Sequence, residues 1–226
     1  MKISVNRLKS MIKQVLKESV RIPGASVQDY PSLAMEMTQL HAEIEAKGGI
    51  LYKRHKMPGN LPSFLRSTCK QMFGAIFNEL YLLEVEILDF SKSLSRYTSI
   101  SPQRLHFTIR GYTKRMIDLS DVQSYGTISG EYSGYFEASM PAEKTSDDSV
   151  TYDLFIDIPV NDPDEPRLDE SFESAYIYSV LVAIFGNDPG ASIEPYDFDK
   201  KPVRTGANLD DFGEVESYNT EYQDID

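Results

Sequence analysis

Residues 127–140, TISGEYSGYFEASM, and residues 150–158, VTYDLFIDI, decide the fold, because apolar and polar side chains alternate along both stretches. Such alternation is typical of a β-strand that buries one face and leaves the other in water. Residues 105–110, LHFTIR, have the same period. We therefore expect an antiparallel sheet of three or four strands with one wet face, in which the polar residues 141–149 connect the last two strands. Gly130 and Gly134 lie on the apolar side and indicate a bend, a bulge or a close approach of a helix.

Three other segments have the spacing of helices. Residues 30–47 carry apolar side chains on one helical face and are followed by Gly48-Gly49, a common helix end. Residues 62–96 predict one long helix of roughly 35 residues and about 50 Å, in which Gly74 is the candidate break. Residues 171–185 are apolar on most faces, so we expect this helix to be buried across the apolar face of the sheet.

Together these patterns predict an α+β fold with four regions. Residues 1–22 form a basic amphipathic leader helix, residues 23–100 a helical region, residues 101–190 the antiparallel sheet with its packing helix, and residues 191–226 an acidic flexible tail. The prediction of the tail depends on residues 210–226, which contain seven acidic residues and no basic one. The acidic residues that we expect to meet a partner are Asp210, Asp211, Glu214 and Glu216.

Composition excludes several classes of protein. Of the 226 residues, 41% are hydrophobic and 26% are charged, which is ordinary for a globular chain and excludes wholesale disorder. The single cysteine, Cys69, excludes an intramolecular disulfide and a metal centre with several cysteine ligands. The sequence has neither an apolar run of about 18 residues nor a secretory signal. We therefore expect no membrane association, and a location in a virion or in the host cytoplasm.

The net charge of −12 is unevenly distributed along the chain. Residues 1–117 hold 18 Lys and Arg against 9 Asp and Glu, whereas residues 118–226 hold 5 against 26. This separation of charge suits contacts between copies of the chain, or with a basic partner. Attraction to phosphate dominates general affinity for nucleic acid, so from an acidic chain we expect no nucleic-acid partner.

The first 22 residues place an apolar stripe on one side of a helix and lysines on another. The stripe consists of Leu8, Met11, Ile12, Val15 and Leu16, and it either packs on the body of the protein or is a docking surface for a partner. The opening MKISVNRLKSMIKQVLKE resembles an N-terminal segment that recurs in proteins of marine tailed bacteriophages, with the pattern M-K-I-[ST]-x-x-x-L-[KR]-x-[IM]-[IV]-[KR]-x-x-[IL]. The resemblance covers about 20 of the 226 residues. It implies a virion-associated protein and identifies no catalytic residue.

Candidate groups for chemistry are few. Glu131, Glu137, Asp153 and Asp157 would share the wet face of the sheet, where carboxylates can hold a divalent metal for hydrolysis. The alternative is a solvated face that keeps the sheet soluble and blocks edge pairing. Cys69 is expected to be a buried structural thiol. We expect neither a catalytic residue nor a metal or other cofactor.

A basic patch formed by Lys53, Arg54 and Lys56 precedes the turn at Pro58-Gly59. A phosphate contact is one interpretation of this patch. A solvated turn or a salt-bridge patch between subunits is the other interpretation, and it is the one that we favour.

Three functions are compatible with these observations. The first is a non-enzymatic structural or assembly protein of a phage virion, such as a neck, tail, head–tail connector or capsid-associated subunit. It would form homo-oligomers through the long helix and its oppositely charged ends, and would contact other virion proteins. The second is an acidic inhibitor that mimics the charge of DNA, and the third is a metal-dependent hydrolase. We favour the first.

Overall fold

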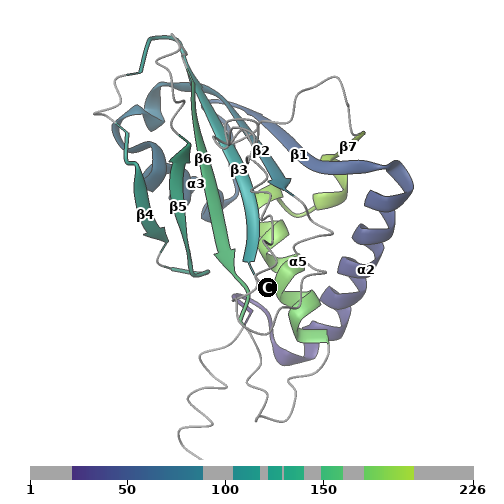
Figure 1. The fold of residues 1–226 in the computed structure, drawn as a ribbon. Coiled ribbons are helices and arrows are strands. Elements are labelled where there is room, and N and C mark those ends of the chain that lie inside the picture. The colour runs from purple at the N-terminus through teal and green to yellow at the C-terminus, as the bar shows by residue number, and fades with distance from the viewer. Residues whose placement is uncertain are drawn as a thin grey trace, which may run out of the picture.

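A computed structural model describes residues 22–88, 104–117, 122–128, 130–139, 149–159 and 171–195. These residues form two layers, a twisted antiparallel sheet and a layer of helices on one of its faces (Figure 1). The strands are β1 (Gly49–Lys56), β2 (Leu80–Leu88), β3 (Arg104–Thr113), β4 (Tyr125–Ile128), β5 (Gly134–Ser139), β6 (Ser149–Asp157) and β7 (Ile193–Pro195). The α-helices are α2 (Tyr30–Lys47), α3 (Ser63–Phe73) and α5 (Ser171–Phe185). The predicted α+β class is confirmed.

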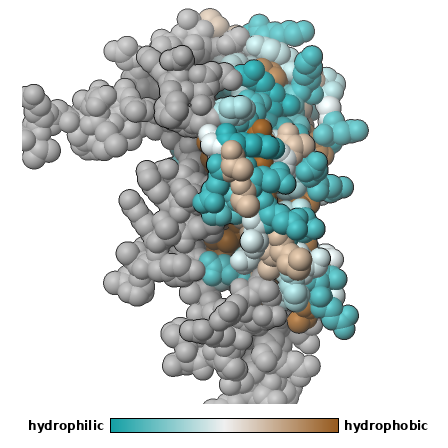
Figure 2. All heavy atoms as spheres, turned by 90° about the vertical axis from the view of Figure 1, so that its right-hand side faces the viewer, coloured by the Kyte–Doolittle hydropathy of each residue, from teal (hydrophilic) through white to brown (hydrophobic). Residues whose placement is uncertain are grey.

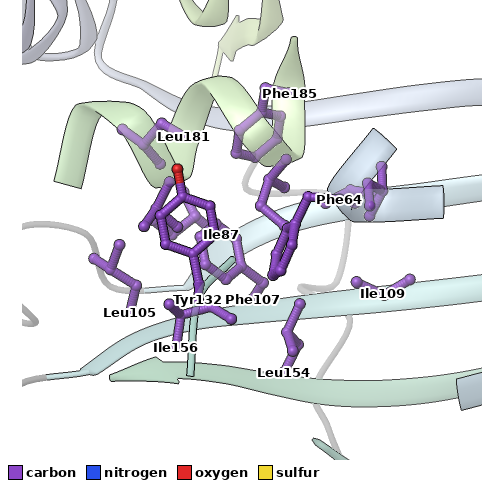
Figure 3. Packing of buried hydrophobic residues seen from close by; sticks show 14 of the residues in the cluster. Phe64, Ile87, Leu105, Phe107, Ile109, Tyr132, Leu154, Ile156, Leu181 and Phe185 are labelled. Carbon is purple, nitrogen blue, oxygen red and sulfur yellow. The ribbon is translucent and has the colours of Figure 1, made fainter. Parts of the chain in front are cut away.

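The seven strands of the described residues are ordered β4-β5-β6-β3-β2-β1-β7 in one sheet. The central pair is β3 with β6, in which Phe107 lies opposite Leu154 and Ile109 opposite Tyr152. All four of these side chains are fully buried and belong to the hydrophobic core. Phe107, Ile109 and Leu154 are labelled in Figure 3, on the side of the sheet that faces α5. The alternation along β3 and β6 therefore predicted the buried face correctly, and β5 pairs with β6 as expected.

Helix α5 spans the predicted residues 171–185 and is buried, as expected from its lack of a polar face. The ring of Phe185 at its end lies 6.2 Å from the ring of Phe107 on β3. Helix α2 packs beside α5 and also agrees with the prediction. It ends at Gly48, whose φ of 54° lies in the left-handed region that favours glycine. Figure 2 shows that hydrophilic side chains dominate the described part of the side of the molecule formed by α2, with isolated apolar residues between them.

The predicted long helix over residues 62–96 is wrong. Helix α3 stops at Phe73, a 3-10 helix follows over Gly74–Glu79, and the chain then enters β2. Gly74 is the break, with a φ of 49° and a ψ of −122° that side-chain-bearing residues rarely adopt. Leu83 and Ile87 fit both a helical stripe and one face of a strand, but the alternation of Leu83, Val85 and Ile87 with Glu84 and Glu86 is the signal for a strand that the prediction missed. The long helix of the described chain is α2.

The sheet is larger than the three or four strands predicted. Two of the additional strands, β1 and β2, come from the region expected to be helical. The alternating residues 127–140 are two strands, β4 and β5, separated by a turn in which Gly130 has a φ of 144°. Gly134 begins β5 where a Cβ would lie 2.0 Å from the backbone oxygen of Phe155. The close approach at this glycine is therefore one between neighbouring strands and not the approach of a helix.

Candidate functional site

The sheet face opposite the helices carries polar and aromatic side chains from six strands, and we call it the polar sheet face. The alternation and register of the strands place there, among others, Tyr52, Arg54, Lys56, Glu84, Glu86, Arg104, His106, Thr108, Arg110, Tyr112, Tyr125, Tyr135, Glu137, Asp153, Phe155 and Asp157. Among the described residues, α2, α3 and α5 all pack on the other side of the sheet (Figure 1).

The Glu84 carboxylate is the centre of a hydrogen-bond network across β1, β2 and β3. Arg54 donates from Nε to Glu84 Oε1 at 2.8 Å and to the Tyr52 hydroxyl oxygen at 2.7 Å. The Tyr112 hydroxyl donates to Glu84 Oε2 at 2.9 Å. Burial by itself would raise the pKa of the Glu84 carboxyl, but hydrogen bonds from Tyr52, Tyr112 and Arg54 outweigh burial and lower it. Glu84 is therefore held ionised in a fixed orientation.

Glu86 has a different environment on the same strand. Its side chain is buried, and the Glu84 carboxylate lies on the same face two residues away. Burial, followed by the negative charge of Glu84, raises the pKa of the Glu86 carboxyl, and Arg110 offsets part of this increase. On the same strand, the pKa of Glu84 is therefore lowered and the pKa of Glu86 is raised from the usual value of a glutamate.

The acidic residues of β6 bind partners on β3 and β5. Asp153 accepts a hydrogen bond from the Ser139 hydroxyl at 2.8 Å through Oδ2, and its Oδ1 lies 2.7 Å from Nε2 of His106. Arg104 donates to Asp157 at 2.6 Å. Arg104 therefore neutralises Asp157, whereas Asp153 is held by Ser139 and His106.

Aromatic rings are stacked across three strands of this face. The rings of His106 and Phe155 are 4.4 Å apart and inclined by 17°, and those of Phe155 and Tyr135 are 4.7 Å apart and inclined by 19°. The Arg104 guanidinium lies 5.0 Å from the centre of the Tyr135 ring. Beyond this stack, Tyr125 on the edge strand is 56% exposed. The stack presents a rigid, partly apolar surface.

The four carboxylates proposed to hold a metal do not converge. Glu131 lies in the turn between β4 and β5, while Glu137 and Asp153 are paired in register on neighbouring strands. Asp157 is four residues further along β6 and bonds Arg104. In the part of the chain that the structure describes, no three His, Cys, Asp or Glu side chains gather as a metal site would require.

The predicted basic patch is divided between the two faces of the sheet. The patch is part of β1 rather than of a turn, so alternate side chains point to opposite sides. Arg54 and Lys56 lie on the polar sheet face, whereas Lys53 points to the helices and donates to the carbonyl oxygen of Phe185 at 2.5 Å. Lys53, Arg54 and Lys56 therefore do not form one basic patch.

A second candidate site is a cleft of about 660 Å³ on the helical side. It lies between the C-terminal half of α5, the end of β1, the start of α3 and the turn that follows β4. Phe64 and Tyr132, which line it, lie below α5 in Figure 3, and Phe185 lines it from the end of α5 itself. The rings of Phe64 and Tyr132 meet edge to face, 5.0 Å apart, and the Tyr132 hydroxyl is 2.8 Å from Ser179 Oγ.

Lys53 and His55 are the cationic or basic side chains that line this cleft. Nε2 of His55 is buried, and no group of the described residues forms a hydrogen bond with it. Burial, followed by the charge of Lys53, lowers the pKa of His55 to about 4, so the imidazole is neutral at pH 7. Glu131 supplies a carboxylate at the rim.

Other predicted residues lie elsewhere. The apolar stripe of the leader and the four acidic residues of the tail are outside the described residues. Cys69 is buried as expected, and this burial raises the pKa of its thiol, which makes it a poor nucleophile. Tyr52, Tyr112 and Tyr135 on the polar sheet face were missed, although each alternates with buried residues of its own strand.

Comparison of the chain with protein families, with curated proteins and with solved structures found no match. None of the helices in the described ranges is both long and apolar enough to span a membrane.

Proposed function

We propose that this chain is a non-enzymatic structural or assembly protein of a tailed-phage particle, and that it self-associates through the polar sheet face. The observation that carries the proposal is the residue content of that face. Tyr52, Tyr112, Tyr125 and Tyr135 lie there with three arginines on a single rigid sheet. Tyrosine and arginine are the residue types that most often dominate the energetics of protein interfaces.

The distribution of charge on this face favours a second copy of the chain as the occupant. Arg54 and Lys56 make the β1 end basic, whereas Glu137 and Asp153 make the β5–β6 end acidic. If two copies pack face to face about a twofold axis parallel to the strands, β1 of one copy lies over β5 of the other. Unlike charges then meet at both ends of the interface, as a self-complementary dimer requires.

The assignment to a phage particle rests on the N-terminal segment, which resembles that of marine tailed-phage proteins. In this proposal the apolar stripe of Leu8, Met11, Ile12, Val15 and Leu16 docks on another virion protein, while the sheet face joins identical subunits. The helix of residues 62–96, which was expected to join subunits, does not exist as one element, so the proposed interface is on the sheet.

The native mass of the full-length protein tests self-association. We would measure it by light scattering after gel filtration, at several protein concentrations and at low and high salt. Glu137→Lys reverses a charge on the polar sheet face, and Glu36→Lys makes the same change on the exposed side of α2. Because both variants change the net charge equally, a difference between them isolates the effect of the face.

We expect Glu137→Lys to weaken the dimer and Glu36→Lys to leave it unchanged. Lys56→Glu reverses a charge at the β1 end of the face and is expected to weaken the dimer as well. High salt should also weaken the dimer, since it screens such contacts. A wild-type protein that is monomeric at every concentration and salt would overturn the proposed self-association.

A further inference from the structure

The geometry points to a second site, which is independent of the polar sheet face. The cleft at the C-terminal end of α5 binds a small organic anion, which is a carboxylate or phosphate group attached to an apolar body. Lys53 and His55 lie at the polar end of the cleft. The cleft volume of about 660 Å³ is in the range of small-molecule sites. Nothing in the contacts of the polar sheet face depends on this cleft.

Lys53 is positioned to meet an anion. Its side chain leaves the sheet on the helical side and is oriented by the hydrogen bond that its Nζ donates to the carbonyl oxygen of Phe185. A lysine ammonium has three N–H donors, so two more are available for a ligand. The carbonyl holds the cation in one place, and the ligand does not have to order a free lysine side chain when it binds.

His55 provides a second polar contact next to Lys53. Its Nε2 is buried at the cleft and lacks a hydrogen-bonding partner among the described residues. Buried ring nitrogens are normally hydrogen-bonded, so this atom gains a partner if the ring turns toward a ligand oxygen in the cleft and donates its N–H to it. The first turn of α3 lines the same end through Ser63 and Phe64, and no side chain caps that turn. Its free backbone N–H groups also favour negative charge.

The remaining wall accommodates an apolar body. Leu61, Phe64, Tyr132, Val182 and Ala183 contribute ring and aliphatic surface. Glu131 is the one carboxylate among the residues that line the cleft, and Tyr178, Asn60 and Asn187 add neutral polar groups. A ligand with an anionic group at Lys53 and an aromatic or aliphatic part against Phe64 and Tyr132 would satisfy both parts of the cleft.

Phenyl phosphate is the probe for this proposal, with inorganic phosphate as the anion without a ring and phenol as the ring without an anion. Binding to the full chain is measured by isothermal titration calorimetry. The pH titration of His55 is followed by NMR in parallel. Because the chain has three histidines, His55→Gln identifies the resonance by removing it.

We expect phenyl phosphate to bind more tightly than phosphate or phenol, and to raise the pKa of His55 from about 4, because a bound anion favours the imidazolium. Lys53→Met is expected to weaken binding about tenfold or more, since it removes a charge-assisted hydrogen bond. Lys53→Arg, which keeps the charge, should retain more affinity. Ala183→Phe, which keeps Lys53 and fills the apolar part, should also reduce binding. Lys47→Met on the exposed end of α2 is the matched control and should bind normally.

Three results would overturn the proposal. The first is absence of phenyl phosphate binding to the folded wild-type protein at millimolar concentration. The second is equal affinity for phenyl phosphate and for one of the two fragments. Equal affinity for inorganic phosphate would show that the apolar body is not recognised, and equal affinity for phenol would show that the anion is not recognised. The third is binding that leaves the His55 titration unmoved and is unaffected by Lys53→Met. Circular dichroism of each variant separates loss of the site from loss of the fold.

Discussion

Gly74→Ala tests the physical reason why residues 62–96 do not form one helix. Gly74 follows α3 with a φ of 49° and a ψ of −122°, and its N–H bonds the carbonyl oxygen of Lys70. The chain then turns through the 3-10 helix into β2. An L-alanine at this position has a Cβ that conflicts with the backbone in such a conformation. If the turn is what ends α3, the substitution must cost stability.

The expected magnitude follows from two opposing terms. Strain of an L residue in a disfavoured backbone region costs about 1–3 kcal/mol. The smaller conformational entropy of unfolded alanine relative to glycine returns about 0.4–1 kcal/mol. We therefore expect Gly74→Ala to lower the free energy of unfolding by about 1–2 kcal/mol. In a chain of this size that corresponds to a decrease in Tm of about 2–8 °C.

The measurement is urea-induced unfolding followed by circular dichroism, supported by tyrosine fluorescence because the chain has no tryptophan. Gly190→Ala is the control, because Gly190 has no left-handed φ and its nearest neighbours are carboxylate ends of Glu43 and Asp188. The control is expected to change the free energy of unfolding by less than about 0.5 kcal/mol.

The sign of the effect discriminates between two structures. If residues 62–96 were one continuous helix, alanine would replace glycine inside it and stabilise the protein by about 1 kcal/mol. An increase in stability on Gly74→Ala would therefore refute the break at Gly74. It would also refute the assignment of Leu80–Leu88 as a strand of the sheet.

Other predictions follow from single buried groups. Because folding raises the pKa of Glu86 above its usual value of 4.5, its ionisation destabilises the folded state as the pH rises through and above that value. Glu86→Gln should therefore be more stable than wild type in urea unfolding at pH 7. This advantage should disappear below about pH 4, where the carboxyl is protonated in both the folded and the unfolded state. An equal advantage at both pH values would contradict the raised pKa of Glu86. Tyr152→Phe removes the hydroxyl that donates a hydrogen bond to the buried carbonyl oxygen of Met72, and should lower the free energy of unfolding by about 1–3 kcal/mol in the same assay. An unchanged free energy of unfolding would show that this carbonyl has another hydrogen-bond donor. Cys69 should react with a thiol reagent only at the rate of unfolding, because it is fully buried and its pKa is raised; rapid labelling of the native protein would disprove its burial.

The polar sheet face shows why a site of this kind is hard to predict from the sequence. Glu84 bonds residues 30 positions before it and 28 positions after it. The sequence analysis placed Glu137, Asp153 and Asp157 on one side of the sheet correctly, because period two assigns every second residue to one side, but Asp153 is buried there and not in water. It could not assign their partners, because partners depend on which strands lie side by side and in which register.

The cleft was hard to predict from the sequence for the same reason. The sequence analysis grouped Lys53 with Arg54 and Lys56 because they are adjacent, and read the tract as a turn. In the structure Lys53 bonds Phe185, which is 132 residues away, and shares a cleft with His55. The signal that could have separated these residues is the alternation of Leu51, Lys53 and His55 on one side of β1. It is obscured because only Leu51 among them is apolar.

The sequence by itself determined the elements whose cause is local. The period-two pattern along β3 and β6, the apolar composition of residues 171–185 and the glycines after α2 each act within a few residues, and they were predicted correctly. Leu83, Val85 and Ile87 alternate with Glu84 and Glu86, but only the tertiary structure decided that Leu80–Leu88 is a strand, since Leu83 and Ile87 also continue the helical spacing of the residues before them. A strand needs hydrogen bonds from its neighbours, and β1 and β3 supply them to β2. The size of the sheet, the polar sheet face and the cleft all follow from that pairing, which no local pattern encodes.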